Sequence, residues 1–249
     1  MISELIPIYI ISLADEKLRK DALKKQFPAY YNQFKFIDAF DFRNKNIEDI
    51  GHLYNRCTHN EKNPLTSTEI GCSLSHIEAL NLFLESKHKR CLILEDDIIG
   101  TDKDIDLSLQ LLRNNFNNGL YILGGQEGMK NGKYLCGYMN LTNIYTVPYL
   151  ARFFLYRTCC YSVDRWWAKQ IIIRQNTCLR RADDWTQLTK FRKDVFFFKV
   201  LKHPLTLENS YIQHERNLSK DNLASLVYRN FLKLYLSSLI LFRQLKKIK

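Results

Sequence analysis

Three adjacent carboxylates follow a short apolar run near the middle of the chain. The run CLIL at residues 91–94 has the composition of a buried strand, and Glu95, Asp96 and Asp97 come directly after it. Three neighbouring negative charges repel one another, so folding them together costs free energy unless a cation or several donors meet them. Mg²⁺ and Mn²⁺ are hard ions that bind a few carboxylates together with substrate phosphate. The motif therefore predicts a Mn²⁺ or Mg²⁺ site, and the alternative is an exposed acidic turn.

The first third of the chain predicts alternating strands and helices. Strands are expected at 7–13 and 34–40, with a helix at 15–27 between them. A second helix begins at the capping box Thr66–Glu69 and leads into the strand at 91–94. This alternation is typical of a largely parallel α/β sheet, whose ligands lie at the carboxyl ends of the strands. The three carboxylates stand at such an end.

The rest of the chain up to residue 217 continues the mixed pattern. The sequence predicts a loop or hairpin at 126–148, a helix at 164–173, and strands at 120–125, 158–163 and 194–202. We therefore expect one α/β domain over residues 1–217.

The segment 218–249 differs from the rest, because it is rich in Leu and Lys and poor in acids. Its apolar stripe consists of Leu223, Leu226, Val227, Phe231, Leu234, Leu241, Phe242 and Leu245. Cations are supplied by Arg229, Lys233, Arg243, Lys246, Lys247 and Lys249. A basic amphipathic helix of this kind lies on an anionic membrane surface, and the alternative is a core-packing or dimer helix.

Composition narrows the class of protein. The 249 residues are 46% apolar and carry a net charge of +11, which favours an anionic partner. The seven cysteines show no C-x-x-C spacing, which argues against a disulfide framework and for a reducing compartment. The N-terminus lacks the pattern of a signal peptide, and no apolar run is long enough to span a bilayer, so we expect a cytoplasmic location.

Several motifs in order resemble glycosyltransferase family 25, the lipooligosaccharide glycosyltransferases that include β-1,4-galactosyltransferases. They are IISL at 10–13 with Arg19, FIDA at 36–39, EIGCSLSH at 69–76, LEDDI at 94–98, and YSV at 161–163 followed by Asp183 and Asp184. One departure is Lys20, where the family carries a second Arg. The resemblance implies a GT-A-like fold, a nucleotide-diphosphate sugar donor, a divalent cation and inversion at the anomeric carbon.

The resemblance also places the metal and the base. It implies that Asp97 holds the metal and that Glu95 or Asp96 contacts the ribose or sugar. It also implies that His203 or His214 supplies a histidine ligand to the metal, and the alternative for each is a structural or surface role.

Asp184 is the predicted base, with Asp183 as the helix N-cap, and the alternative is that these residues only start a helix. The neighbouring Trp185 could stack against a sugar face.

The remaining donor-binding predictions fall at the ends of the first two strands and on the helix after the capping box. Ser12, Leu13 and Arg19 would hold base and ribose, although Arg19 also fits a solvated helix face. Asp38 could accept from uracil or ribose, or be a strand-end turn residue. The last two predicted donor-binding residues are Ser75 and His76, and the alternative for the histidine is a satisfied core position.

Together these observations predict a metal-dependent inverting glycosyltransferase. It would move a sugar, most simply galactose from UDP-galactose, to a lipooligosaccharide at the inner face of a bacterial inner membrane. The alternatives are a metal-dependent nucleotidyltransferase or phosphohydrolase, or a basic nucleic-acid-binding protein. The last is disfavoured because the sequence shows no aromatic-basic module, so we expect no nucleic acid partner.

Overall fold

One mixed sheet runs through the protein. The computed structural model describes residues 5–55, 64–114, 118–129, 131–190, 194–205, 223–242 and 244–248, with side chains from 227 onward in the last helix. The sheet has nine strands in the order β2-β1-β3-β7-β4-β8-β6-β5-β9. Their bounds are β1 Ile8–Ser12, β2 Phe34–Asp38, β3 Arg90–Glu95, β4 Leu120–Gly124, β5 Cys136–Met139, β6 Tyr145–Thr146, β7 Cys160–Asp164, β8 Val195–Leu201 and β9 Lys246–Lys247.

The central strands are mostly parallel. β1 pairs in parallel with both β2 and β3, and β4 pairs in parallel with β8. β7 lies between β3 and β4 and is antiparallel to both. The carboxyl ends of β1, β3, β4 and β8 therefore meet at one edge of the sheet, together with the amino end of β7. The predicted α/β class with a largely parallel sheet is confirmed.

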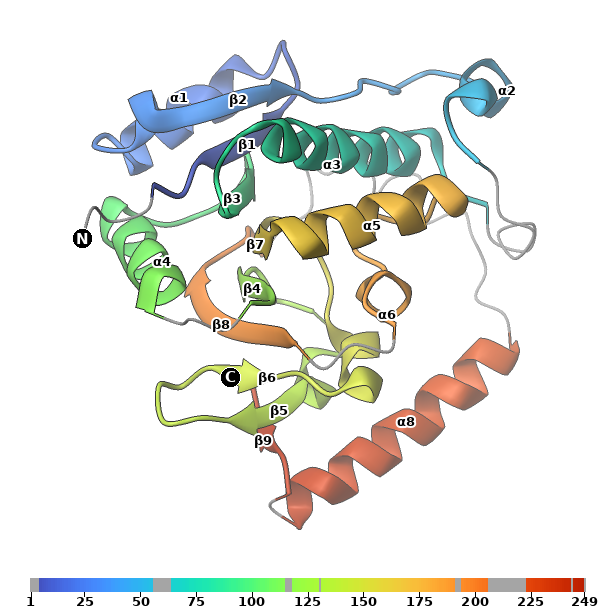
Figure 1. Ribbon diagram of the computed structural model, residues 1–249. Helices are drawn as coiled ribbons and strands as arrows, with labels where there is room; N and C mark the ends of the chain where they lie inside the picture. The colour runs from blue at the N-terminus through green and yellow to red at the C-terminus, as the bar shows by residue number, and fades with distance from the viewer. Residues whose placement is uncertain are drawn as a thin grey trace.

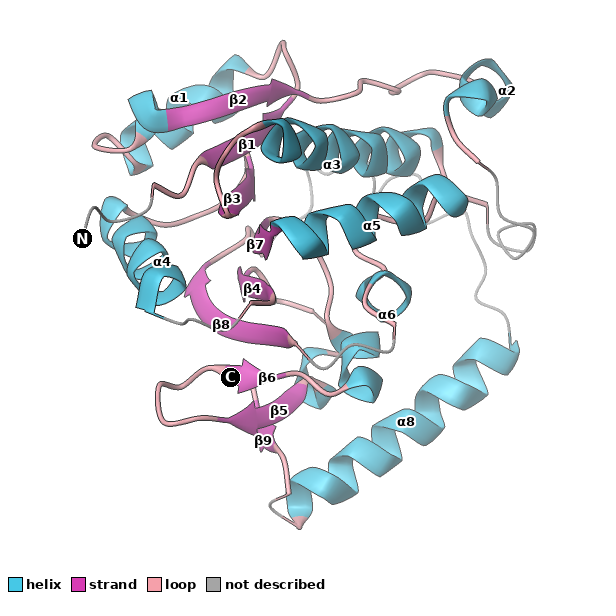
Figure 2. Ribbon diagram, viewed as in Figure 1, coloured by secondary structure: helices cyan, strands magenta, loops and turns pink. Residues whose placement is uncertain are grey.

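Helices cover both faces of this sheet (Figures 1 and 2). α3 and α5 lie side by side on one face with α6 below them, while α1 and α4 lie on the other. The helix bounds are α1 Lys17–Gln26, α2 Ile47–Ile50, α3 Ser67–Glu85, α4 Asp102–Asn114, α5 Arg165–Thr177, α6 Trp185–Leu188 and α8 Leu223–Leu241. The order of layers is helix, sheet, helix.

β3 shows why the carboxylates stand at the end of a buried strand. Cys91 and Ile93 pack into the cluster under α3 and α5, whereas Leu92 and Leu94 pack into the cluster under α1 and α4. All four are fully buried, as expected for a strand covered on both faces. β3 is therefore held rigidly from both sides.

The start of α3 is fixed as the sequence predicts. The Thr66 hydroxyl accepts from the Glu69 backbone N–H at 3.2 Å, and the Glu69 carboxylate accepts from the Thr66 N–H at 3.1 Å. Leu65 and Ile70 are both buried in one small apolar cluster, consistent with a hydrophobic staple. These contacts set where each later side chain of α3 points.

The region 126–148 contains the predicted hairpin, preceded by turns and a short 3₁₀ helix at Gly132–Tyr134. β5 and β6 pair antiparallel, and β6 joins this hairpin to β8. β9 extends the sheet beyond β5.

The last helix is integrated into the fold. Leu232 and Leu236 of α8, together with Leu245 and Ile248 after it, are buried in the core cluster under α5. Leu245, predicted as part of the apolar stripe, thus fits the core-packing alternative, because β9 draws this part of the chain onto the hairpin. No helix in the described part of the chain has the length and apolarity needed to cross a bilayer.

Cysteine chemistry departs from the sequence expectation in one place. Cys178 is in a disulfide. The absence of C-x-x-C spacing therefore does not exclude a disulfide.

A substitution at Gly124, the last residue of β4, tests how closely β4 and β8 approach each other. Its φ is +134°, and a Cβ there would lie 1.9 Å from the carbonyl oxygen of Leu201. Gly124→Ala should therefore lower the free energy of unfolding by roughly 2 kcal/mol or more in urea denaturation. Gly132→Ala is the matched control, since its Cβ would meet nothing closer than 3.7 Å. Equal stabilities for the two variants would contradict this account of the contact.

Candidate active site

A cavity of about 260 Å³ opens at the sheet edge where the strand ends meet. Its walls come from the ends of β1 and β3, the first half of α3, and the segments before β7 and α6 and after β8. The residues predicted for the site that line it are Ser12, Leu13, Arg19, Ser75, His76, Glu95, Asp96, Asp97, Asp183 and His203. Residues distant in sequence are thus gathered by the topology.

Asp97 and His203 form a pair at this edge. The His203 Nε2 lies 3.2 Å from the Asp97 Oδ2. After the turn that carries Asp97, Ile99 exchanges two backbone hydrogen bonds with Lys202, at 2.8 and 2.9 Å. This short bridge ties the end of β8 to the acidic turn. It explains why a histidine more than 100 residues away faces the carboxylate.

The electrostatics of this pair are those of an ion pair. Burial opposes the charged form of Asp97, but the hydrogen bond and charge of His203 outweigh it, so the pKa of Asp97 is lowered. Burial likewise opposes charge on His203, yet Asp97 holds the pKa of His203 above its ordinary value. The Oδ1 of Asp97 is buried and accepts no hydrogen bond within the described part of the chain.

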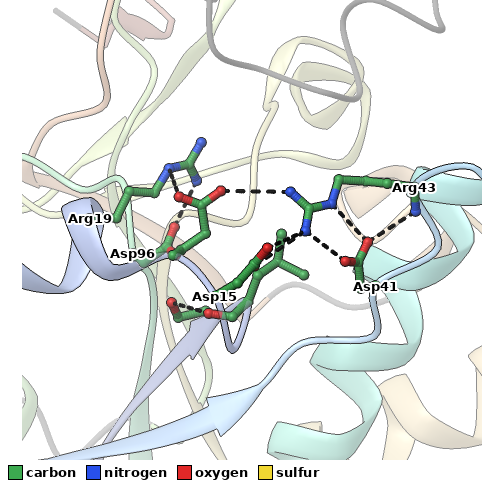
Figure 3. Close-up of polar contacts among 8 residues, drawn as sticks. Asp15, Arg19, Asp41, Arg43 and Asp96 are labelled. Atoms are coloured by element: carbon green, nitrogen blue, oxygen red, sulfur yellow. Dashed lines mark hydrogen bonds and ion pairs between the residues drawn. The ribbon is translucent and has the colours of Figure 1, made fainter.

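Asp96 faces a different cation. The Arg19 Nη1 donates to the Asp96 Oδ1 at 2.8 Å, and this contact is visible in Figure 3. Burial of Asp96 raises its pKa, and the bonds from Arg19 and Ser12 only partly offset that effect. Asp96 and Asp97 therefore point to opposite partners from one turn, which relieves their mutual repulsion.

Figure 3 also shows a second guanidinium beside the first. Arg43 contacts Asp41 at 2.6 Å and Asp15 at 3.0 Å. Arg43 lines the cavity with Arg19. Carboxylates thus hold two cationic groups at the rim near the end of β1.

Glu95 is held from the other side. The Thr158 hydroxyl donates to the Glu95 Oε1 at 2.5 Å, and the His76 Nε2 lies 3.3 Å from the same oxygen. The Nδ1 of His76 lies 3.1 Å from the Tyr161 hydroxyl. His76 is therefore both buried and part of the cavity wall.

Ser75 acts on the loop after β2. Its hydroxyl donates to the Gly71 carbonyl at 2.7 Å and accepts from the Phe40 backbone N–H at 2.8 Å. A Cβ at Gly71 would lie 2.5 Å from the Phe40 carbonyl oxygen. The glycine and serine of the EIGCSLSH motif thus dock this loop on α3, so Ser75 shapes the cavity wall.

The two aspartates before α6 differ in position, and the N-cap is not the one predicted. Asp184 is the N-cap of α6 and accepts from the Gln187 backbone N–H at 3.2 Å, and it is not among the cavity-lining residues. Burial raises its pKa. Asp183 lines the cavity and accepts from the Arg157 backbone N–H at 3.2 Å. The prediction of Asp183 as the capping residue is therefore wrong.

Two other predicted residues, Trp185 and Asp38, do not line the cavity. Trp185 is buried in the core and donates from Nε1 to the Arg157 carbonyl at 3.0 Å, so it is not available to stack on a sugar. Asp38 is exposed at the end of β2 and does not line the cavity. His214 lies outside the described residues.

Arg157 is the main residue that the sequence reading missed. Its φ of 62° is left-handed, an uncommon conformation for a residue with a side chain. The guanidinium donates to the carbonyls of Gly125 and Glu127 at 2.7 and 2.9 Å, while the backbone meets Asp183 and Trp185. No local motif marks such a position, because the conformation is imposed by these contacts.

The Asp97–His203 pair suits a divalent cation. A ligating histidine usually donates its other ring N–H to a carbonyl or carboxylate, and the Nδ1 of His203 lies 2.9 Å from the Pro204 carbonyl oxygen. The buried, unbonded oxygen of Asp97 offers a second ligand atom beside the histidine. An oxygen and an imidazole nitrogen together are suited to Mn²⁺, and the residues present therefore fit the predicted ion.

Sequence comparison identifies the family. A family profile described as glycosyltransferase family 25, LPS biosynthesis protein, matches residues 5–132, just over half of the chain. The chain belongs to glycosyltransferase family 25. A Haemophilus influenzae protein named as a predicted glycosyltransferase is 36% identical over 93 residues, covering 36% of this chain and 32% of that protein. The match thus spans about a third of the relative's length.

Solved structures give distant likenesses. A glycosyltransferase involved in glycosylation of the major capsid of PBCV-1 is 7% identical, with 86% of this chain and 98% of that chain covered and a TM-score of 0.45. Glucosyl-3-phosphoglycerate synthase from Mycobacterium tuberculosis, solved with Mn²⁺ and UDP-glucose, is 11% identical, with coverages of 96% and 79% and a TM-score of 0.40. Galactosyltransferase LgtC, solved with donor and acceptor sugar analogues, is 12% identical, with coverages of 76% and 61% and a TM-score of 0.34. Likenesses this distant specify neither substrate nor mechanism.

The Asp97–His203 pair predicts a pH window of stability in metal-free buffer. Because the pKa of Asp97 is lowered, Asp97 adds to the free energy of unfolding at pH values above 3.8, the ordinary pKa of an aspartate. This contribution is lost as the pH falls through the pKa of Asp97 in the folded protein. Because the pKa of His203 is raised, His203 adds to the free energy of unfolding at pH values below 6.5, the ordinary pKa of a histidine. This contribution is lost as the pH rises through the pKa of His203 in the folded protein. His203→Gln should therefore cost most between these values, roughly 1 to 3 kcal/mol, by urea denaturation with chelator. A cost independent of pH would contradict the ion pair.

Proposed function

We propose that the protein is a metal-dependent glycosyltransferase of GT-A type that uses a nucleoside-diphosphate sugar, most simply UDP-galactose. The observation that carries this proposal is the pairing of His203 with Asp97, which has a buried oxygen free to take a ligand, at the edge of the cavity. A divalent cation bound there would neutralise negative charge on the departing nucleoside diphosphate. Family membership supports the same reaction class.

Cationic side chains in the cavity wall would assist donor binding. Arg19 and Arg43 lie at the rim, held by carboxylates, and Arg157 is fixed by carbonyls on the wall near His203. Guanidinium groups recognise phosphate with fixed geometry. Because these three are already ordered, little conformational entropy is lost when the diphosphate binds.

Asp183 is the base that this arrangement favours. Its carboxylate lines the cavity and is oriented by the Arg157 backbone N–H. In the proposed reaction the acceptor hydroxyl attacks the anomeric carbon of the donor sugar. The bond between that carbon and the diphosphate oxygen breaks. The nucleoside diphosphate leaves, and the acceptor proton passes to Asp183. Attack from the side opposite the leaving group inverts the anomeric centre.

The outward face of α8 supports a membrane-bound acceptor such as a lipooligosaccharide. Its exposed apolar side chains are Val227, Tyr228, Phe231, Leu234, Tyr235, Leu241 and Phe242, and we call this set the α8 stripe. Lys246 and Lys247 are exposed close to the end of this helix. An apolar face flanked by cations suits an anionic bilayer surface. We therefore propose peripheral attachment to the inner face of the bacterial inner membrane.

A nucleotidyltransferase or phosphohydrolase could use the same metal-binding edge. Such an enzyme would turn over nucleoside triphosphates without a sugar acceptor, whereas a glycosyltransferase would require a sugar nucleotide. A screen of UDP- and CMP-sugars, run beside nucleoside triphosphates, separates the two classes.

Asp97→Asn tests the role of the acidic turn in transfer. The substitution removes the charge on the proposed metal ligand, and the loss of several kcal/mol of charge stabilisation corresponds to at least roughly a 100-fold lower kcat/KM. Asp21→Asn, on the exposed side of α1, is the matched control and should behave as the unmodified protein. Near-normal turnover of the best sugar nucleotide by Asp97→Asn with Mn²⁺ present would refute the proposal.

The two adjacent aspartates allow a matched test of the base. Asp183→Asn should lower kcat by about 100-fold or more, with donor affinity little changed. Asp184→Asn makes the same chemical change one residue on, and because Asn is also a good N-cap the helix start should survive. The reverse result, a large loss only in Asp184→Asn, would return the role of base to Asp184.

Membrane attachment is tested without deleting α8, because its inner face belongs to the core. Phe231→Ser combined with Leu241→Ser should reduce co-sedimentation with phosphatidylglycerol vesicles by roughly 10-fold or more, since each substitution removes apolar surface that would be buried in the bilayer. Leu141→Ser, a fully exposed leucine on the β5–β6 hairpin, is the control. Equal binding by all three proteins would contradict a role for the α8 stripe.

A further inference from the structure

A second group of metal-ligating side chains lies where α3 passes the end of β3. One ligand atom each of Cys72, His76 and Glu95 lies within 4.8 Å of the other two. All three residues line the cavity. We propose that this group, the thiol cluster, is a separate site for a thiophilic divalent cation of the Zn²⁺ class.

The backbone holds two of the three ligands in a fixed relation. Cys72 and His76 are four residues apart on α3, so their side chains lie on one face of the helix. The capping box at the start of α3 fixes the rotation of that face relative to β3. Glu95 is the last residue of β3, a strand buried on both sides. The cluster is therefore built on rigid elements.

The spacing agrees with tetrahedral coordination. Bonds from zinc to imidazole nitrogen and carboxylate oxygen of about 2.0 to 2.2 Å place these two atoms about 3.4 Å apart. The His76 Nε2 and the Glu95 Oε1 lie 3.3 Å apart. The sulfur of Cys72 lies within 4.8 Å of one ring nitrogen of His76 and one carboxylate oxygen of Glu95 and would be the third ligand. Three ligands with a fourth position left to water are typical of open zinc sites.

Neighbouring hydroxyls orient the ligands. The Nδ1 of His76 meets the Tyr161 hydroxyl at 3.1 Å, which leaves Nε2 facing the cluster. Tyr161 is buried. The Thr158 hydroxyl fixes the Glu95 carboxylate at 2.5 Å. Such partners fix the tautomer and direction of ligating groups.

The ligand types distinguish this cluster from the Asp97–His203 pair. A thiolate with an imidazole favours Zn²⁺ or Co²⁺, whereas oxygen-rich sites favour Mg²⁺ and Mn²⁺. The two groups also come from different elements, with α3 supplying two ligands here and the segment after β8 supplying His203. Occupancy of the thiol cluster would take up part of the cavity and exclude the sugar nucleotide, and this consequence alone rests on the proposed function.

Co²⁺ absorption of the full-length protein tests the proposal directly. Co²⁺ bound to the thiol cluster should show a thiolate-to-metal charge-transfer band, which Zn²⁺ displaces. Cys72→Ser should abolish the band and weaken Zn²⁺ binding on the order of 100-fold in competition with a chromophoric chelator. His76→Gln is a second variant with the same expected loss. Cys136→Ser, a buried thiol outside the cavity, is the control, and thermal unfolding checks that each variant folds.

Mn²⁺ binding, followed by the electron paramagnetic resonance of the free ion, separates the two sites. Cys72→Ser should keep Mn²⁺ binding, and Asp97→Asn should lose it while keeping the Co²⁺ band. A band absent from the unmodified protein, or unchanged in Cys72→Ser, would overturn the thiol cluster as a site. Loss of Mn²⁺ binding in Cys72→Ser would contradict the proposal that the thiol cluster and the Asp97–His203 pair are separate sites. If the unmodified protein shows the Co²⁺ band but does not bind Mn²⁺, the result would contradict the proposed function and leave the thiol cluster supported.

Discussion

The rest of the site depends on how two adjacent carboxylates are kept at the end of a buried strand. Asp96 and Asp97 would destabilise the fold if they faced one another in a poorly solvated place. The turn after β3 sends them apart, toward Arg19 on α1 and His203 after β8. Each cation comes from a different element, so the acidic turn stabilises the assembly of the sheet edge as well as the cavity.

The sheet topology explains why so many distant segments reach one cavity. β7 is inserted antiparallel between β3 and β4, so its amino end stands among the carboxyl ends of its neighbours. That places Thr158 beside Glu95 and lets Arg157 contact the turn after β4. The left-handed backbone at Arg157 then links this wall to Asp183. One strand reversal thus joins the end of β3 to the proposed base.

Sequence patterns predicted the features that are local. The apolar run before Glu95, the capping box of α3 and the α/β alternation are encoded within a few residues, and all are confirmed. The direction of β7 could not be predicted, because an apolar strand pattern is the same in either direction. Neither could the roles of Asp183 and Asp184, since both suit an N-cap and tertiary contacts decide between them. α8 has one apolar face packed on the core and a second apolar face that is exposed. The sequence pattern predicts a single apolar stripe and does not separate the two faces.

We propose above all that the Asp97–His203 edge binds a cation that carries a nucleoside diphosphate. Calorimetric titration of UDP into the full-length protein, with Mn²⁺ and then with chelator, tests it most directly. The account predicts saturable binding with Mn²⁺ that is lost with chelator and equally lost in His203→Gln with Mn²⁺ restored. UDP binding of the same strength under all three conditions would contradict it.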